Sequence, residues 1–224
     1  MLQEKEALAD LKGILFDWDG TVVDSFQALW ASQRYAYRRH VGIDFPRNEE
    51  EFRCVSPMRL AESTAMYAGE HAEEVAASYV WYYTHEAYKL CTLFEGMREV
   101  WLALRTRGYC VGVVTNTNLA RLSADLIHLG LDGMLDVMVT SDDTRERKPH
   151  PAPLLKAAEK LATPPHQFAY VGDYAGDIVA AHSAGMIAVA ALWGGIFPSE
   201  TLLAEQPDYA AAYPGRLLAI FPGR

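Results

Sequence analysis

The sequence predicts an α/β fold: a doubly wound parallel sheet with an inserted α-helical segment. Two observations lead to this prediction. Short continuous apolar runs alternate with amphipathic helical patterns, which is typical of parallel strands covered by helices on both faces. Residues 24–93 interrupt the alternation, because they show helical patterns and no convincing strand. We therefore expect a core made of residues 1–23 and 94–224, and a helical cap domain of residues 24–93 that acts as a lid.

Five apolar runs are expected to form the sheet, over residues 13–16, 109–114, 134–139, 168–171 and 187–192. Each run ends at polar residues or glycines. In doubly wound folds ligands bind at the carboxyl ends of the strands. The residues that follow these runs are therefore candidates for a functional site.

Apolar residues at three- and four-residue spacing predict helices over residues 96–107, 118–129 and 151–161 between the strands. The interrupting region is expected to hold three more helices. They cover residues 26–40, a stretch that starts at Ser56 and Pro57 and ends near Gly69, and residues 73–90. The alternative is that these helices belong to the layers of the core.

Composition narrows the range of partners and compartments. Half of the 224 residues are hydrophobic, and the formal net charge of −9 argues against a nucleic-acid partner. No apolar run approaches the ~20 residues that a membrane span requires, and the polar N-terminus does not resemble a signal peptide. Three widely spaced cysteines fit a reducing compartment. We expect a cytoplasmic protein, monomeric or homodimeric, that does not bind membranes.

Two carboxylates directly after the first strand form the most informative motif. Asp17 and Asp19 leave the strand end on the same side, because strand side chains alternate with period two. Like charges persist side by side when a cation binds or when one group holds a proton. Gly20 allows a sharp turn that brings backbone N–H groups to a ligand. The motif therefore suggests a metal and phosphoryl site, with an ordinary turn as the alternative. An EF-hand calcium loop is excluded, because such a loop needs Glu at its twelfth position, and the twelfth residue counted from Asp17 is Ala28.

Three further motifs stand at strand ends or just before helices. Thr115 and Asn116 follow the second core strand, Lys148 precedes Pro149 and a helix, and Asp173 and Asp177 follow the fourth apolar run. Each has an ordinary explanation alone: a helix cap, a solvated lysine, a turn. All of them together at such positions argue against coincidence.

In this order the motifs resemble those of the haloacid dehalogenase-like hydrolase superfamily, in its phosphoglycolate-phosphatase-like and β-phosphoglucomutase-like branch. That branch has a Rossmann-like core with a helical cap inserted after the first strand. The resemblance covers nearly the whole chain. It rests on Asp17-x-Asp19-Gly20-Thr21, Lys148-Pro149 and Gly172-Asp173-x-x-x-Asp177.

The resemblance implies a role for each matching residue. Asp17 would be the nucleophile, Asp19 the general acid and base, and Lys148 a cation that neutralises nucleophile and phosphate. Thr115 would join them as a catalytic contact to the phosphoryl group.

Phosphate and metal binding are implied in the same way. The phosphate-binding residues would be Gly20, Thr21, Thr115, Asn116 and Lys148. Mg²⁺ would be held by Asp17, Asp19 and Asp173, and Asp177 would support a metal-bound water or Lys148.

The expected function is that of a Mg²⁺-dependent phosphatase acting on a small phosphorylated metabolite, possibly phosphoglycolate, through an aspartyl-phosphate intermediate. The alternatives are a phosphomutase of the same fold and a degenerate, non-catalytic binding or regulatory protein. Two positions depart from the family pattern: Trp18 is bulkier than the usual aliphatic residue, and Tyr174 replaces a small hydroxyl residue.

A loop between two helices of the insertion is a candidate for substrate selection. Residues 53–59 carry two cations, Arg53 and Arg59. Either guanidinium could bind a substrate carboxylate or second phosphate with two parallel hydrogen bonds. The alternative is that both are solvated surface charges.

Overall fold

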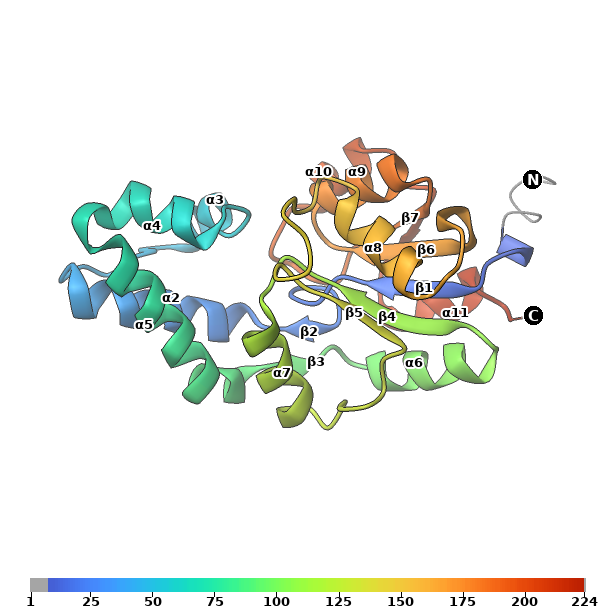
Figure 1. Cartoon of the computed structure of the whole chain (residues 1–224), viewed down its shortest axis with the longest axis horizontal. Helices are drawn as coiled ribbons and strands as arrows, with labels where there is room; N and C mark the ends of the chain where they lie inside the picture. Colours follow the sequence, from blue (N-terminus) through green and yellow to red (C-terminus); the bar gives the residue numbers. More distant parts are fainter. Residues whose placement is uncertain (1–7, 224) are drawn as a thin grey trace.

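A six-stranded parallel sheet forms the centre of the protein, in the order β5-β4-β1-β6-β7-β8 (Figure 1). The computed structural model describes residues 8–223, so the polar N-terminal residues 1–6 lie outside the described part. The strands are β1 (Gly13–Phe16), β4 (Cys110–Val114), β5 (Val137–Val139), β6 (Phe168–Gly172), β7 (Ile187–Ala191) and β8 (Tyr209–Ala211). The predicted doubly wound α/β fold is confirmed. The sequence analysis missed β8, a three-residue strand at the edge of the sheet.

Helices cover both faces of this sheet. The core helices are α6 (Met97–Thr106), α7 (Leu119–His128), α8 (Ala152–Lys160), α9 (Ala175–Ala184), α10 (Ser199–Ala204) and α11 (Leu217–Ile220), with 3₁₀ turns at Pro165–Gln167 and Pro214–Arg216. Ile14 and Phe16 of β1 pack into the cluster under α6 and α7, whereas Leu15 packs into the cluster under α8 and α9. Alternate side chains of one strand thus enter two cores, which explains why β1 is continuously apolar.

The segment between β1 and β4 is helical and lies beside the sheet, on the left of Figure 1. It contains α2 (Phe26–His40), α3 (Glu49–Val55), α4 (Leu60–Ala68) and α5 (Ala72–His85), with 3₁₀ turns at Gly69–His71 and Ala87–Leu90. Its buried residues form a third hydrophobic cluster. A helix over residues 26–40 was predicted and is confirmed.

Three details of this segment differ from the prediction. Helix α3 was missed; Asn48 caps it by accepting a 2.9 Å hydrogen bond from Glu51 N, and glutamates fill its first turn, where the helix dipole favours them. Helix α4 is capped by Arg59 and not by Ser56 and Pro57. The third expected helix ends at His85, before a short 3₁₀ turn.

A small antiparallel ribbon joins the helical segment to the core. Strand β2 (Val23–Asp24) pairs with β3 (Thr92–Leu93), with Val23 opposite Leu93. The expectation of no strand within residues 24–93 is therefore wrong at both ends of that range. The chain enters and leaves the segment side by side.

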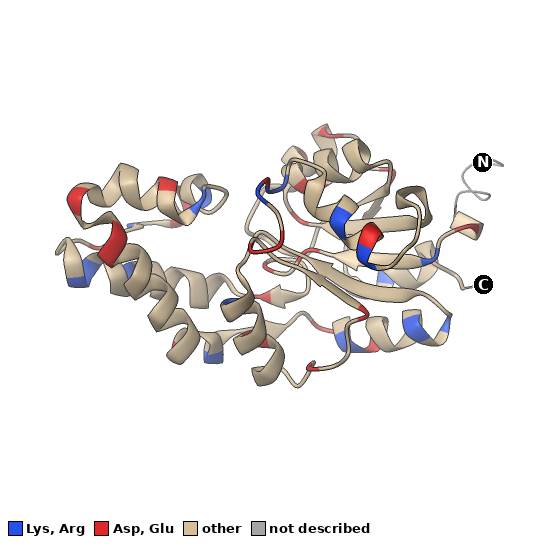
Figure 2. Ribbon diagram, in the orientation of Figure 1, with Lys and Arg blue, Asp and Glu red and all other residues tan. Residues whose placement is uncertain are grey.

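Lysine and arginine residues are scattered over the core and the helical segment (Figure 2). Over residues 8–223, no helix combines the length and the apolar character needed to cross a membrane.

Candidate active site

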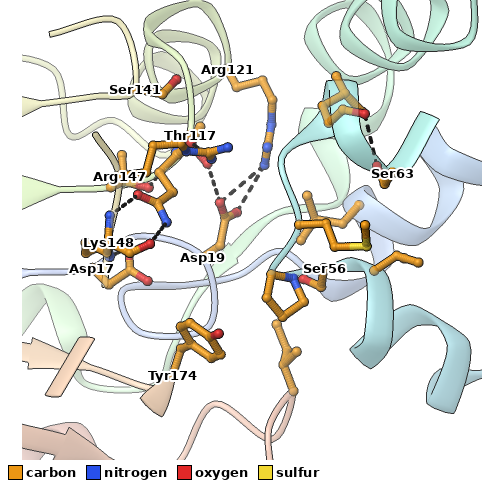
Figure 3. A pocket seen from close by; sticks show the side chains of 18 of the residues that line it. Asp17, Asp19, Ser56, Ser63, Thr117, Arg121, Ser141, Arg147, Lys148 and Tyr174 are labelled. Atoms are coloured by element: carbon orange, nitrogen blue, oxygen red, sulfur yellow. Dashed lines mark hydrogen bonds and ion pairs between the residues drawn. The ribbon is translucent and has the colours of Figure 1, made fainter. Parts of the chain in front are cut away.

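The carboxyl ends of β1, β4 and β6 bring the predicted motifs together. Asp17 follows β1, where its N–H donates a 2.8 Å hydrogen bond to Val171 O of β6. A cavity of about 210 Å³ opens at this edge. The motif residues line one side of it, and Ser56, from the turn between α3 and α4, lines the other (Figure 3). The site thus lies between the sheet and the helical segment.

Lys148 is the buried cation at the base of the site. Its Nζ lies 2.8 Å from Asp17 Oδ1 and 2.7 Å from Asp177 Oδ1, and it donates a 2.5 Å hydrogen bond to the Tyr170 hydroxyl. Burial alone would lower the pKa of Lys148, but the two carboxylates outweigh it, so its pKa is raised. Lys148 is therefore a fixed positive charge beside the proposed nucleophile.

The carboxylates of Asp17, Asp173 and Asp177 form an acidic group whose ligand oxygens all lie within 4.8 Å of one another. Burial raises the pKa of Asp17 to about 7, although Lys148 opposes this shift. Burial, with Asp17 and Asp177 nearby, raises the pKa of Asp173 well above its ordinary value. Such a group is stabilised when a cation joins it.

Asp173 has a free oxygen that fits this cation. Its Oδ1 accepts a 2.9 Å hydrogen bond from the Thr21 hydroxyl. Its Oδ2 is buried and, within the described part of the chain, has no hydrogen-bond partner. A hard cation with oxygen ligands, such as Mg²⁺, would satisfy it. The residues present therefore fit the expected metal.

Gly20 allows the carboxylate of Asp173 to lie close to the main chain of the loop after β1. Its φ is +81°, a backbone conformation that favours glycine, and a Cβ on it would overlap the carboxylate of Asp173. Thr21 is fully buried and its hydroxyl is used on Asp173. Both residues thus support Asp173, and their expected contact with phosphate stays a prediction.

Asp19 lies apart from the acidic group. Its Oδ2 accepts a 2.6 Å hydrogen bond from the Thr117 hydroxyl, and both of its oxygens lie within 3.3 Å of the Arg121 guanidinium (Figure 3). The structure brings the carboxylate of Asp177, and not that of Asp19, to the three-carboxylate group. The carboxylate of Asp19 faces the cavity, where an acid or base would meet a leaving group.

Thr117 and Arg121 were not identified from the sequence. Thr117 belongs to the same polar run as Thr115 and Asn116, so its position gave a signal. Arg121 lies inside the amphipathic pattern of α7, and its guanidinium carbon is 4.1 Å from the centroid of the Tyr83 ring of α5. No local pattern indicates that contact.

Thr115 and Asn116 both line the cavity. The Thr115 hydroxyl accepts a 3.1 Å hydrogen bond from Thr117 N. The Asn116 side chain donates to Lys148 O and accepts from Lys148 N, each at 3.1 Å. Asn116 therefore holds the main chain of Lys148, and its amide is engaged before any phosphoryl group arrives.

Arg53 and Arg59 are placed away from the cavity wall. Arg53 belongs to α3, pairs with Glu49 at 3.1 Å and donates to Ile196 O. Arg59 lies 3.8 Å from Glu62. Neither side chain is among those that line the cavity. Their part in substrate selection stays a prediction.

Known proteins resemble this chain over most of its length. Residues 14–191 match the family model described as haloacid dehalogenase-like hydrolase. The chain is 31% identical over 218 residues to the phosphoglycolate phosphatase of Xanthomonas campestris pv. campestris, covering 92% of this chain and 94% of that protein. It is also 31% identical over 208 residues to the pyrophosphatase PpaX of Bacillus mycoides, covering 92% and 95%.

A solved structure agrees with these matches. The haloacid dehalogenase-like family protein SP0104 from Streptococcus pneumoniae superposes with a TM-score of 0.84 and 25% identity, covering 95% of this chain and 99% of that one.

Proposed function

Because the chain belongs to the haloacid dehalogenase-like hydrolases and is a phosphatase of that family, we propose that it hydrolyses a small phosphorylated metabolite through a covalent phospho-Asp17 intermediate, with Mg²⁺ as cofactor. The observation that carries the proposal is the position of Lys148 Nζ, 2.8 Å from Asp17 Oδ1 at the base of the cavity. A phosphate monoester repels a carboxylate, and a fixed cation beside the nucleophile offsets that repulsion.

The first half of the proposed reaction uses Asp17 and Asp19. An oxygen of Asp17 attacks phosphorus, and the bond from phosphorus to the leaving oxygen breaks. Asp19, held by Thr117 and Arg121, gives its proton to that oxygen. General acid catalysis of this kind contributes roughly 10²–10⁴-fold.

The second half regenerates the enzyme. Asp19 takes a proton from water, the water oxygen bonds to phosphorus, and the bond to Asp17 breaks to release phosphate. Asp17 and Asp173 would hold Mg²⁺, with Asp177 beside them, and the ion would supply positive charge that favours ionised carboxylates and offsets the charge of the phosphoryl group.

The helical segment is proposed to act as a cap. Residues 24–93 would close over the core of residues 1–23 and 94–224 and exclude water from the cavity. Residues from both parts line that cavity, which supports this division.

Phosphoglycolate and pyrophosphate are the two substrates that the relatives' names suggest. The test is release of inorganic phosphate by the purified enzyme with Mg²⁺ from a panel that includes both, several sugar phosphates and p-nitrophenyl phosphate. Turnover of one substrate at more than a hundred times the rate of the Asp17→Asn variant supports the proposal. A sugar phosphate that is isomerised without phosphate release would indicate a phosphomutase. No turnover of any substrate would indicate a non-catalytic protein.

A further inference from the structure

Arg147 carries a charge that forms no ion pair within the described part of the chain. It lies in the loop between β5 and α8, one position before Lys148, and its side chain lines the cavity (Figure 3). Its Nε is buried and lacks a hydrogen-bond partner within residues 8–223. Over the same residues, no carboxylate lies within ion-pair distance, 4.0 Å, of the guanidinium. By contrast, Arg121, which also lines the cavity, pairs with Asp19.

A partly buried, unpaired cation is costly, because burial removes water that no carboxylate replaces. Burial lowers the pKa of Arg147, and the neighbouring Arg59 and Arg121 add to this, whereas Glu62 and Asp17 oppose it without reversing it. An anion bound in the cavity would replace the interactions lost with water and would offset the repulsion from the neighbouring arginines. The planar guanidinium offers two parallel N–H groups, a geometry that matches a carboxylate or a phosphate.

Asn116 fixes Arg147 and Lys148 relative to each other. Its side chain binds the main chain of Lys148, and its carbonyl oxygen accepts a hydrogen bond from the Arg147 guanidinium. Lys148 is turned toward Asp17 and Asp177. The two cations are thus held at separate places in one cavity. Lys148 lies beside the nucleophile, and Arg147 has no carboxylate of residues 8–223 within 4.0 Å.

We propose that Arg147 is a specificity-determining residue that binds a second anionic group of the substrate. The inference rests on the proposed phosphatase activity and narrows its substrate class. Substrates are small molecules in which the reacting phosphoryl group is accompanied by a carboxylate or a second phosphate. Phosphate esters of neutral alcohols and sugars lack this contact.

The experiment compares kcat/KM for charged and neutral substrates in wild type and variants. Phosphoglycolate tests a carboxylate as the second group and inorganic pyrophosphate tests a phosphate; 2-phosphoglycolamide and ethyl phosphate are the neutral references. The variants are Arg147→Ala and Arg147→Lys, which keeps the charge but not the planar fork. Arg145→Ala is the matched control, because Arg145 is exposed in the same loop and does not line the cavity. Thermal unfolding of each variant verifies the fold.

For the second group that the enzyme recognises, carboxylate or phosphate, we expect wild type to have a higher kcat/KM for the charged substrate than for its neutral reference. Arg147→Ala should reduce that preference by roughly tenfold or more, through KM, and leave kcat/KM for the neutral reference nearly unchanged. Arg147→Lys should restore part of the preference, and Arg145→Ala should retain all of it. The substrate whose preference falls identifies the second group.

Three results separate the possible failures. If Arg147→Ala lowers kcat/KM equally for charged and neutral substrates, or alters neither, the specificity role is wrong while the phosphatase activity stands. If wild type releases phosphate from sugar phosphates or p-nitrophenyl phosphate but from none of these four compounds, this inference is wrong and the proposed function stands. If it releases phosphate from no compound of the whole panel, the proposed function fails, and this inference fails with it.

Discussion

The indole Nε1 of Trp18 donates a 2.9 Å hydrogen bond to Asp125 Oδ2, although 107 positions separate the two residues. Tyr83 of α5 donates its hydroxyl to the same carboxylate, also at 2.9 Å, and all three side chains are fully buried. Trp18 stands between Asp17 and Asp19. The bulky residue that departs from the family pattern thus ties the catalytic loop to α7 and, through Tyr83, to the helical segment.

The Asp125 carboxyl predicts an unusual dependence of stability on pH. Burial, with Asp19 nearby, raises the pKa of Asp125 from 3.8 to about 6. Between these values the native state holds a proton that the unfolded state has lost, so the free energy of unfolding falls as pH rises. Above pH 6 this contribution to stability is lost completely. A pKa shift of about two units corresponds to about 3 kcal/mol in the free energy of unfolding.

The Asp125→Asn variant removes this titration while its amide oxygen can still accept both hydrogen bonds. We expect the variant's free energy of unfolding, relative to wild type, to increase from pH 4 to pH 6 and then to level off. Urea unfolding of both proteins at five pH values measures this difference. A difference that does not change with pH would show that Asp125 is already ionised at pH 4.

The nucleophile is tested by Asp17→Asn, which is nearly isosteric but neither nucleophilic nor charged. We expect kcat to fall on the order of 10⁴-fold while the circular-dichroism spectrum and cooperative melting are retained. Steady-state phosphate release is the measurement. Activity within tenfold of wild type would remove Asp17 from the role of nucleophile.

The acid role of Asp19 predicts a dependence on the leaving group. In Asp19→Ala, formation of the phospho-enzyme from an alkyl phosphate should slow by roughly 10²–10⁴-fold. p-Nitrophenyl phosphate should lose less in this step, because its leaving group needs little protonation. Single-turnover kinetics on both substrates compare the losses, and equal losses would contradict the assignment.

The acidic group of Asp17, Asp173 and Asp177 predicts that activity requires Mg²⁺ and that Ca²⁺ inhibits. The group offers only three carboxylates. Ca²⁺ takes more oxygen ligands than Mg²⁺ and holds them in a looser geometry, so we expect it to position the phosphoryl group poorly for in-line attack. Phosphate release is measured after treatment with EDTA and after adding back each ion. Undiminished rates in excess EDTA, or equal rates with the two ions, would count against this site.

The sequence was sufficient for the parts of the fold and site that depend on local pattern. Strands β1, β4, β6 and β7 are apolar on both faces, and the first three end at motif residues, so their positions could be read directly from the sequence. Helix α3 and strand β8 are short, with seven and three residues. Neither is long enough to establish a periodicity.

Contacts between distant residues could not be read in the same way. The pairing of Asp19 with Arg121 spans 102 positions and depends on how α7 lies against β1. The same holds for Arg147: the sequence shows a cation beside Lys148, but only the fold reveals that no carboxylate of the described residues lies within 4.0 Å of it. Long-range packing decides which charges are paired and which remain available to a ligand.

The ribbon of β2 and β3 has a consequence for how this enzyme can diversify. The paired residues Val23 and Leu93 hold the two ends of the helical segment side by side. None of the six strands of the central sheet comes from this segment. Insertions whose ends lie together are well tolerated. The strand order of the sheet is therefore independent of the segment's length. A segment of another size could be accommodated at this point as long as it kept a partner for Asp125 and Arg121, as Tyr83 is here.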